Sequence, residues 1–140
     1  MSPETFLKTI YLGDRLCKSL QMDGFNSRVI LTIDTISRIR SVSGDWEYYT
    51  KEDIDDGLLV FDCVSFVSLT PAGFMPNDWI EIIGVEPIDR TNEPHDGDFK
   101  IKISLGSMTD AGVEKELQLV LIAKDVYLVD PKRKEVLIRD

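Results

Sequence analysis

Cysteine and histidine are scarce in this chain, and their scarcity limits the kinds of site it can hold. Among 140 residues there are 2 cysteines, Cys17 and Cys63, and 1 histidine, His95. A structural zinc site needs about four Cys or His ligands, so a zinc site of that type is nearly excluded. A disulfide requires an oxidising compartment, and the sequence shows no export signal. We therefore expect both cysteines to be buried free thiols.

Long hydrophobic runs and an excess of basic charge are also missing. No apolar stretch approaches the roughly 18 residues of a membrane span, and residues 1–8 lack the basic-then-apolar pattern of a signal peptide. The 16 basic residues are outnumbered by 25 acidic ones, giving a net charge of −9 and a pI near 4.6. This balance disfavours binding to nucleic acids and anionic membranes, both of which select for basic surfaces. We expect a cytoplasmic protein with a basic protein partner.

The composition indicates one globular domain that spans residues 1–140. Hydrophobic residues make up 43% and charged residues 29% of the chain, and the mean hydropathy is −0.08. These values are typical of a folded rather than a disordered chain. A chain of this size buries about two-thirds of its unfolded surface, which is enough for a single core.

The strand-like alternation of apolar residues changes phase at three aspartates. Leu31 and Ile33 are two residues apart, whereas the next apolar residue, across Asp34 and Thr35, is Ile36; the same step occurs at Asp62 and at Asp125. Because side chains alternate between the faces of a strand, this step would turn later apolar residues away from the core. A β-bulge or a bend restores the face, and Asp suits irregular backbone because its side chain bonds to nearby N–H groups. We therefore predict structural roles for these aspartates.

The pattern of elements predicts a mainly all-β fold, an antiparallel β-sandwich or partly open barrel of about seven to nine strands with a short N-terminal helix. Ser2 can cap a helix with Pro3 at its first position, and apolar residues recur at helical spacing as far as Tyr11. No second long helical period follows. The expected strands cover residues 16–22, 29–39, 58–69, 79–85, 99–105, 116–129 and 136–138.

A long loop at residues 41–57 combines acidic and aromatic side chains. Aromatic residues supply rigid contact area and carboxylates supply charge complementarity, so the combination is typical of a binding surface. The alternative is structural: the aromatic rings pin the loop to the sandwich, and Thr50 with Asp53 caps one turn of helix. The candidate partner-binding residues are Trp46, Tyr48, Tyr49, Asp53, Asp55 and Asp56.

The sequence contains no motif that assigns a catalytic residue, a metal ligand or a cofactor. With Gly57 at the glycine position of an EF-hand loop, Ile54 falls at a ligand position and Cys63 at the closing Glu, so the pattern fails. The segment 95–98 places His95 beside carboxylates, as in a general base, but its Asp-Gly pair indicates a turn. Nucleophile motifs and phosphate-binding glycine loops are missing.

Several short strings resemble a small bacterial protein family of unknown function, and the resemblance covers almost the whole chain. It implies no activity, ligand or catalytic residue. More loosely, the β-rich plan with its apolar-Asp-x-Val step is similar to immunity proteins of bacterial polymorphic toxin systems. The strings include Tyr11-Leu12-Gly13-Asp14-Arg15, Ile36-Ser37-Arg38-Ile39-Arg40, Pro71-Ala72-Gly73 and Pro76-Asn77-Asp78.

Two hypotheses for function follow. In the first, the protein is a non-enzymatic interaction domain of the immunity type: the aromatic residues of the loop (Trp46, Tyr48 and Tyr49) anchor a basic partner, while its aspartates (Asp53, Asp55 and Asp56) steer association. In the second, it is a small calcium- or magnesium-dependent β-sandwich, either a binding module or an enzyme. The second hypothesis uses the same three aspartates together with the segment 95–98.

Overall fold

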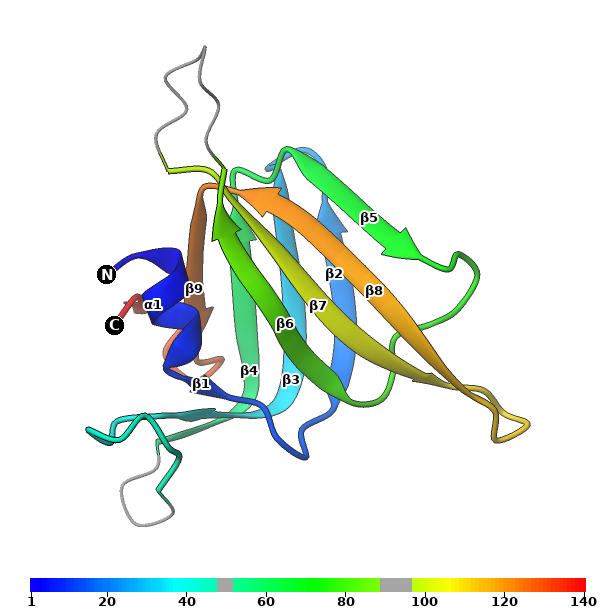
Figure 1. The fold of residues 1–140 in the computed structure, drawn as a ribbon, viewed down its shortest axis with the longest axis horizontal. Coiled ribbons are helices and arrows are strands. Elements are labelled where there is room, and N and C mark those ends of the chain that lie inside the picture. Colours follow the sequence, from blue (N-terminus) through cyan, green and yellow to red (C-terminus); the bar gives the residue numbers. More distant parts are fainter. Residues whose placement is uncertain (48–51, 89–96) are drawn as a thin grey trace.

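The structure, a computed structural model, describes residues 1–47, 52–88 and 97–140, which form two antiparallel β-sheets and one short helix (Figure 1). The described elements are α1 (Pro3–Lys8), β1 (Ile10–Tyr11), β2 (Cys17–Asp23), β3 (Arg28–Arg38), β4 (Asp53–Asp62), β5 (Phe66–Thr70), β6 (Ile80–Pro87), β7 (Phe99–Met108), β8 (Glu114–Ala123), β9 (Asp125–Val129) and β10 (Leu137–Ile138).

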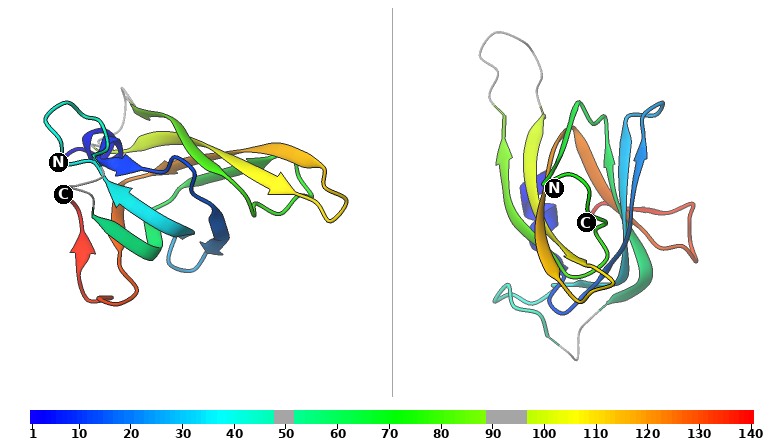
Figure 2. Two further views of the ribbon diagram at one scale, coloured as in Figure 1. Left: turned by 90° about the horizontal axis from the view of Figure 1, so that it is seen from below. Right: turned by 90° about the vertical axis from the view of Figure 1, so that its right-hand side faces the viewer.

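The six-stranded sheet has the order β1-β3-β4-β9-β10, with β2 also paired to β3, and the four-stranded sheet has the order β5-β8-β7-β6. Figure 2 shows the two sheets as facing layers. The mainly β class, the antiparallel sheets and the short N-terminal helix are confirmed, and the described strands do not close into a barrel.

Helix α1 begins where the sequence predicts and ends earlier. The Ser2 hydroxyl caps it by accepting a hydrogen bond of 3.2 Å from the Thr5 N–H. The helix ends at Lys8, and the next residues form β1, in which Tyr11 pairs with Ser37 of β3. The prediction that the helix continues to Tyr11 is therefore wrong beyond Lys8. The backbone of the next residues forms its hydrogen bonds with the neighbouring strand β3 instead. None of the helical segments in the described residues has the length and apolar character needed to cross a membrane.

Two runs that were predicted as single strands each pass from one sheet into the other. β4 ends at Asp62 and the chain continues in the other sheet as β5, while β8 ends at Ala123 and β9 begins in the first sheet at Asp125. The two crossings lie side by side: Asp62 pairs with Asp125, and the Lys124 N–H donates to the Asp62 carbonyl at 3.2 Å. The predicted bends at both aspartates are therefore a single shared corner of the sandwich.

At Asp34 the phase change is matched by a second one in the neighbouring strand. The core-facing residue changes from Ile33 to Ile36 in β3, and from Gly57 to Ile54 in β4. The register of the two strands is nevertheless the same on both sides of this point. Each strand therefore contains one extra residue at the same level, and both return their apolar side chains to the core together.

The side chain of Asp34 stabilises this irregularity. Its carboxylate accepts hydrogen bonds from the backbone N–H groups of Leu16 and Thr35, at 2.9 and 2.8 Å. In β4 the opposite residue, Asp56, has a φ of 52°, a left-handed conformation that Asp tolerates better than most residues. On the other side of β3, the register of β2 shifts between Cys17 and Ser19. Asp34 thus has the predicted structural role.

The hydrophobic core lies between the two sheets, and α1 contributes Phe6 and Leu7 to it. Both sheets supply fully buried side chains; for example, Phe61 of β4 contacts Phe99 of β7, with ring centroids 6.4 Å apart. A smaller cluster of Val60, Tyr127 and Val129 lies outside this core, on the six-stranded sheet.

The two cysteines differ in exposure, so the expectation that both are buried is wrong for Cys63. Cys17 lies in the core, and burial raises the pKa of its thiol to about 11. Cys63 follows β4 at the corner, has a φ of 54° and is exposed. Its apolar neighbours in sequence belong to a crossing between sheets, where alternation no longer indicates which side chains are buried.

We expect a thiol reagent such as DTNB to modify Cys63 in the folded protein and Cys17 only after unfolding, because the reactive thiolate is disfavoured at a buried site with a raised pKa. Absorbance should therefore report one reactive thiol of the two in buffer and both in denaturant. Cys63→Ser should abolish the reaction of the native protein, and Cys17→Ser should leave it intact. A fast native-state reaction in Cys63→Ser would contradict this prediction.

Candidate functional site

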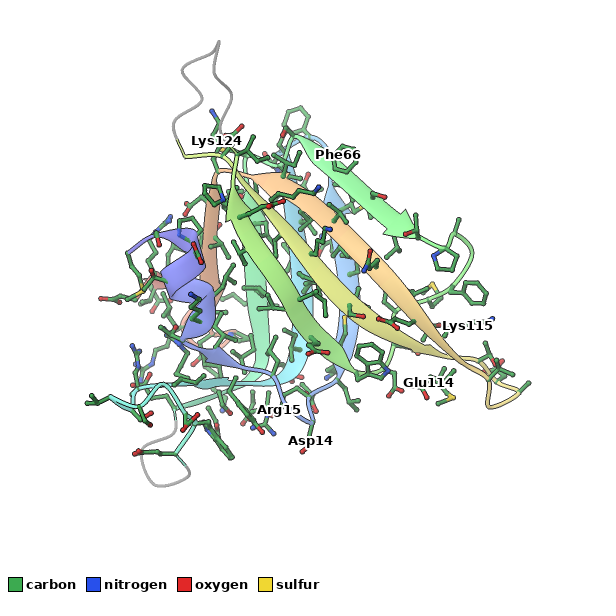
Figure 3. All side chains as sticks on the ribbon, in the orientation of Figure 1. Asp14, Arg15, Phe66, Glu114, Lys115 and Lys124 are labelled. Carbon is green, nitrogen blue, oxygen red and sulfur yellow. The ribbon has the colours of Figure 1, made fainter. Side chains whose placement is uncertain are left out.

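Carboxylates gather at the end of the molecule where the turn between β1 and β2 meets the start of β4. This end lies at the bottom of Figure 1, and Figure 3 labels Asp14 there. The accessible basic side chains at this end, among the described residues, are Arg15, Lys18 and Arg40; Arg38, whose backbone bonds to Glu52, is buried there. We call this surface the acidic end and define it by Asp14, Asp34, Asp45, Glu47, Glu52, Asp53, Asp55 and Asp56.

A chain of hydrogen bonds joins three elements at the acidic end. The guanidinium of Arg15 donates to Ser37 Oγ at 2.8 Å, and Ser37 Oγ donates to the Asp53 carboxylate at 2.6 Å. The Arg15 guanidinium also lies over the ring of Tyr11, 5.8 Å from its centroid. Ser37 is fully buried, so these bonds satisfy a polar group that would otherwise destabilise the fold. The carboxylate of Asp53 therefore has a structural bond in addition to its charge.

Asp55 and Asp56 are the more accessible members of the predicted set. Asp56 forms an ion pair of 2.6 Å with Lys18, in which both side chains are more than half exposed. The hydrogen bond to Asp56 raises the pKa of Lys18. Asp55 is exposed, and its carboxylate forms no ion pair or hydrogen bond with the described residues. These two carboxylates can therefore reach a partner without unfolding the site.

Trp46 packs on the neighbouring strand. Its ring stacks on that of Tyr11, with centroids 4.6 Å apart and an angle of 12° between the planes. Trp46 is half-buried and holds its loop against β1. This agrees with the alternative in which the aromatic rings pin the loop to the sandwich. Tyr48 and Tyr49 lie outside the described residues. Asp53 opens β4 rather than capping a turn of helix, because its backbone pairs with Ser37. The structure thus brings Trp46, Asp53, Asp55 and Asp56 to one end.

The described aspartates of the two segments in the metal hypothesis lie at opposite ends of the sandwich. Asp53 begins β4 at the acidic end, whereas Asp98 precedes β7 beside the corner, where Phe99 pairs with Ala123 (Figure 1). His95 and Asp96 lie outside the described residues. Within the described ranges, no three His, Cys, Asp or Glu side chains approach closely enough to hold a metal ion together.

A groove of about 700 Å³ adjoins the acidic end, between the N-terminal segment and β6. Apolar residues from both sides line it, among them Leu7, Ile10 and Ile82. Asp14 and Arg15 belong to the rim of the groove as well as to the β1–β2 turn, so the two surfaces are continuous. The groove therefore offers apolar contact area directly beside a concentration of negative charge.

The corner carries a second group of charged side chains, which are paired with one another. The Asp62 carboxylate accepts hydrogen bonds from Arg28 Nε at 2.6 Å and from the Tyr127 hydroxyl at 2.8 Å. Asp125 accepts one of 2.6 Å from Arg139, whose guanidinium stacks on Tyr127. Burial alone would raise the pKa of Asp62, but the bonds from Arg28 and Tyr127 outweigh it, and the pKa is lowered. This network stabilises the corner.

We expect the Asp62 network to lose its stabilising effect in acid. Because the folded-state pKa lies below the unfolded value of about 3.9, the contribution is complete above about pH 5 and disappears as the pH falls through the lowered pKa. Urea unfolding at a series of pH values should show a shallower acid dependence for Asp62→Asn than for the wild type. Asp110→Asn, at an exposed turn, should retain the wild-type slope; an unchanged slope for Asp62→Asn would disprove the assignment.

In a comparison with protein families, the model of a family of unknown function matches residues 1–140. The chain belongs to DUF6258, a family of unknown function. Comparisons with curated proteins and with solved structures give no match. The predicted membership in a family of unknown function across almost the whole chain agrees with this finding, and the family brings no activity or ligand with it.

For this DUF6258 protein, sequence reasoning missed the groove. Its two sides, residues 4–15 and 79–85, are far apart in sequence, and each is an ordinary amphipathic segment when taken alone. The only local signal is the string Pro76-Asn77-Asp78, which leads into β6 beside Trp79. The groove becomes visible only when the sheets are assembled.

Proposed function

We propose that this protein is a non-enzymatic protein-interaction domain whose acidic end binds a basic partner. The observation that carries the proposal is the concentration of carboxylates at one end of the molecule, where the described basic side chains are Arg15, Lys18, Arg40 and the buried Arg38. Arg15 and Lys18 are already bonded to Ser37 and Asp56. The chain as a whole carries a net charge of −9, so its long-range field attracts a basic protein and speeds association.

Each carboxylate in this proposal has a role that follows from its environment. Asp55 pairs directly with a Lys or Arg of the partner, since no described residue neutralises it. Asp56 exchanges its exposed partner Lys18 for a cation of the partner, a change that costs little because exposed ion pairs contribute about 0–1 kcal/mol. Trp46, held flat on Tyr11, presents the edge of a rigid aromatic surface. Tyr48 and Tyr49 belong to the same loop and to the same proposal.

More specifically, we propose an immunity-type role, which this charge pattern supports. Such a protein has to bind a single partner quickly and tightly, and complementary charge supplies the association rate while apolar contacts slow dissociation. The groove beside the acidic end supplies the apolar contacts.

The proposal is tested by capturing partners from an extract of the native host with the wild-type protein and with Asp55→Asn/Asp56→Asn. Asn tolerates the left-handed backbone of residue 56, so the double variant keeps the fold. We expect the wild type to retain a basic protein at about 0.15 M salt and to release it at about 0.5 M. The double variant should fail to retain it. Glu86→Gln/Asp110→Asn removes the same number of charges away from the acidic end and should bind as the wild type does.

Two results would count against the proposal. A partner that is retained equally by Asp55→Asn/Asp56→Asn and by the wild type does not depend on the acidic end. A reproducible partner that is itself acidic contradicts the charge argument. Trp46→Ala should weaken the same complex, and an unchanged affinity would remove Trp46 from the interface.

A further inference from the structure

The edge of β6 that faces away from β7 has almost no strand partner among the described residues, because β6 is the last strand of its sheet. Within residues 1–47, 52–88 and 97–140, pairing along this edge begins at one point: Leu16 forms an isolated antiparallel bridge with Trp79, and the Cys17 N–H donates to the Asp78 carbonyl at 2.8 Å. The bridge stands directly before the first residue of β6, so the chain starts a ladder that it does not continue.

The segment preceding the bridge turns away from β6 in a tight turn. The Arg15 N–H donates to the Leu12 carbonyl at 3.2 Å, and Asp14 has a φ of 58°. Because of this turn, residues 4–12, which include most of α1, do not pair with β6, and a groove of about 700 Å³ lies between the two segments. A volume in the range of roughly 300–1,000 Å³ is typical of sites that enclose a ligand. The groove can therefore accommodate several side chains of a bound segment.

The charges around the groove are unequally neutralised. Lys8 is neutralised by Glu4 in an ion pair of 3.4 Å, whereas Arg15 keeps its charge because it donates to the neutral Ser37 hydroxyl. The carboxylates of Asp14 and Glu81 form no ion pair or hydrogen bond with any residue in the described ranges. The groove is therefore lined by three acidic residues, Glu4, Asp14 and Glu81, against two basic ones, and this excess of negative charge favours Lys or Arg in a ligand.

We propose that the groove binds an extended segment of the basic partner, which adds a short strand to the free edge of β6. In this mode the backbone of the segment bonds to β6, alternate apolar side chains rest on the half-buried Ile82 and Val85, and a Lys or Arg lies between Asp14 and Glu81. The inference rests on the proposed function and names the form of the partner that the groove selects.

The register shift between Ile82 and Gly84 limits the length of this ladder. A bulge interrupts an edge and protects it from indiscriminate pairing. An added strand therefore pairs over a short stretch, and side-chain contacts in the groove supply much of the affinity. Ile83, the extra residue of the bulge, is 50% exposed and is available for one of them.

The test uses a synthetic peptide of alternating Lys and Val, blocked at both ends, and follows the backbone amides of the labelled protein by NMR. We expect a Kd of about 0.1–1 mM and slower hydrogen exchange at residues 80–85. Two derivatives carry N-methyl groups, either on every Val or on every Lys. Because N–H groups of one parity point to the same neighbouring strand, one derivative should bind at least about tenfold more weakly.

Variants of the protein separate the charge contribution from the backbone contribution. Asp14→Asn/Glu81→Gln should weaken peptide binding about five- to tenfold, in the range expected for charge-assisted bonds. Asn suits the left-handed backbone of residue 14. Glu86→Gln, at the far end of β6, should bind the peptide as the wild type does. A peptide of alternating Glu and Val should not bind.

The outcomes separate this inference from the proposed function. One result is that the peptide changes the NMR signals of the Asp55 and Asp56 amides and leaves those of residues 80–85 unchanged. That result overturns strand addition in the groove but supports binding at the acidic end. Equal affinity of both N-methylated derivatives and the parent peptide also overturns it. Amide shifts of β6 that grow with protein concentration, without peptide, would assign the edge to a second copy of the chain instead. Peptide binding at β6 with no basic partner captured would leave the groove mode intact and overturn the proposed function.

Discussion

Phe61→Ala is expected to lower the free energy of unfolding by about 3–5 kcal/mol, the range for truncating a buried aromatic residue. Phe61 is fully buried, and its ring lies 6.4 Å from that of Phe99, so the pair joins the two sheets next to the corner. The strands here are tied by the bonds of Asp62 to Arg28 and Tyr127, and they cannot collapse into the cavity that Ala leaves. Urea unfolding measured by circular dichroism gives the difference.

Phe25→Ala is the matched control for this prediction. Phe25 is 98% exposed, at the turn between β2 and β3, so the same truncation removes no core contact. Its effect should stay within about 0.5 kcal/mol. A loss below about 1.5 kcal/mol for Phe61→Ala would show that the corner repacks, contrary to the tied geometry described above.

Gly57→Ala is expected to destabilise the protein by about 1–3 kcal/mol through overpacking. A Cβ at this position would lie 2.7 Å from Cδ1 and 2.9 Å from Cγ1 of Ile36, and 3.2 Å from Cγ2 of Ile54. Both isoleucines are buried at the level where β3 and β4 change phase together. The glycine is therefore required because two core side chains meet over it, and neither can move without leaving the core.

A double-mutant cycle tests this cause directly. Ile36→Val removes the closest atom, so Gly57→Ala should cost less in the Ile36→Val background than in the wild type. Gly24→Ala serves as the control, because a Cβ at Gly24 meets nothing within 4 Å. Additive effects of the two substitutions would mean that the contact with Ile36 is not the origin of the cost.

The strands could be predicted from the sequence because their signal is local. Alternation from Val29 to Ile33 and from Phe99 to Leu105 reports which side chains face the core, and the structure buries the same side chains. The irregularities at Asp34, Asp62 and Asp125 could also be predicted. With period-two alternation, the later apolar residues stay in the core only if the strand bulges or bends there. The pattern does not distinguish between two causes of a phase change. At Asp34 two neighbouring strands each contain an extra residue, whereas at Asp62 the chain crosses from one sheet to the other.

The candidate site was only partly predictable for the same reason. Acidic and aromatic residues in one loop indicate a binding surface, and the structure places Asp55 and Asp56 exposed at one end. It also gives Asp53 a structural bond and Trp46 a stacking partner, neither of which a local pattern reports. The exposure of Cys63 and the early end of α1 likewise depend on pairing with residues that are distant in sequence.

By itself the sequence determined the β-rich class, the short capped helix and the excess of acidic charge, because composition and nearest-neighbour alternation contain that information. Tertiary structure alone decided how the two sheets share a corner, which carboxylates of the described residues are accessible and where the groove beside β6 opens. Those features depend on contacts between segments separated by tens of residues. The pairing of Leu16 with Trp79, which ends after one bridge and leaves the β6 edge open, is one such contact.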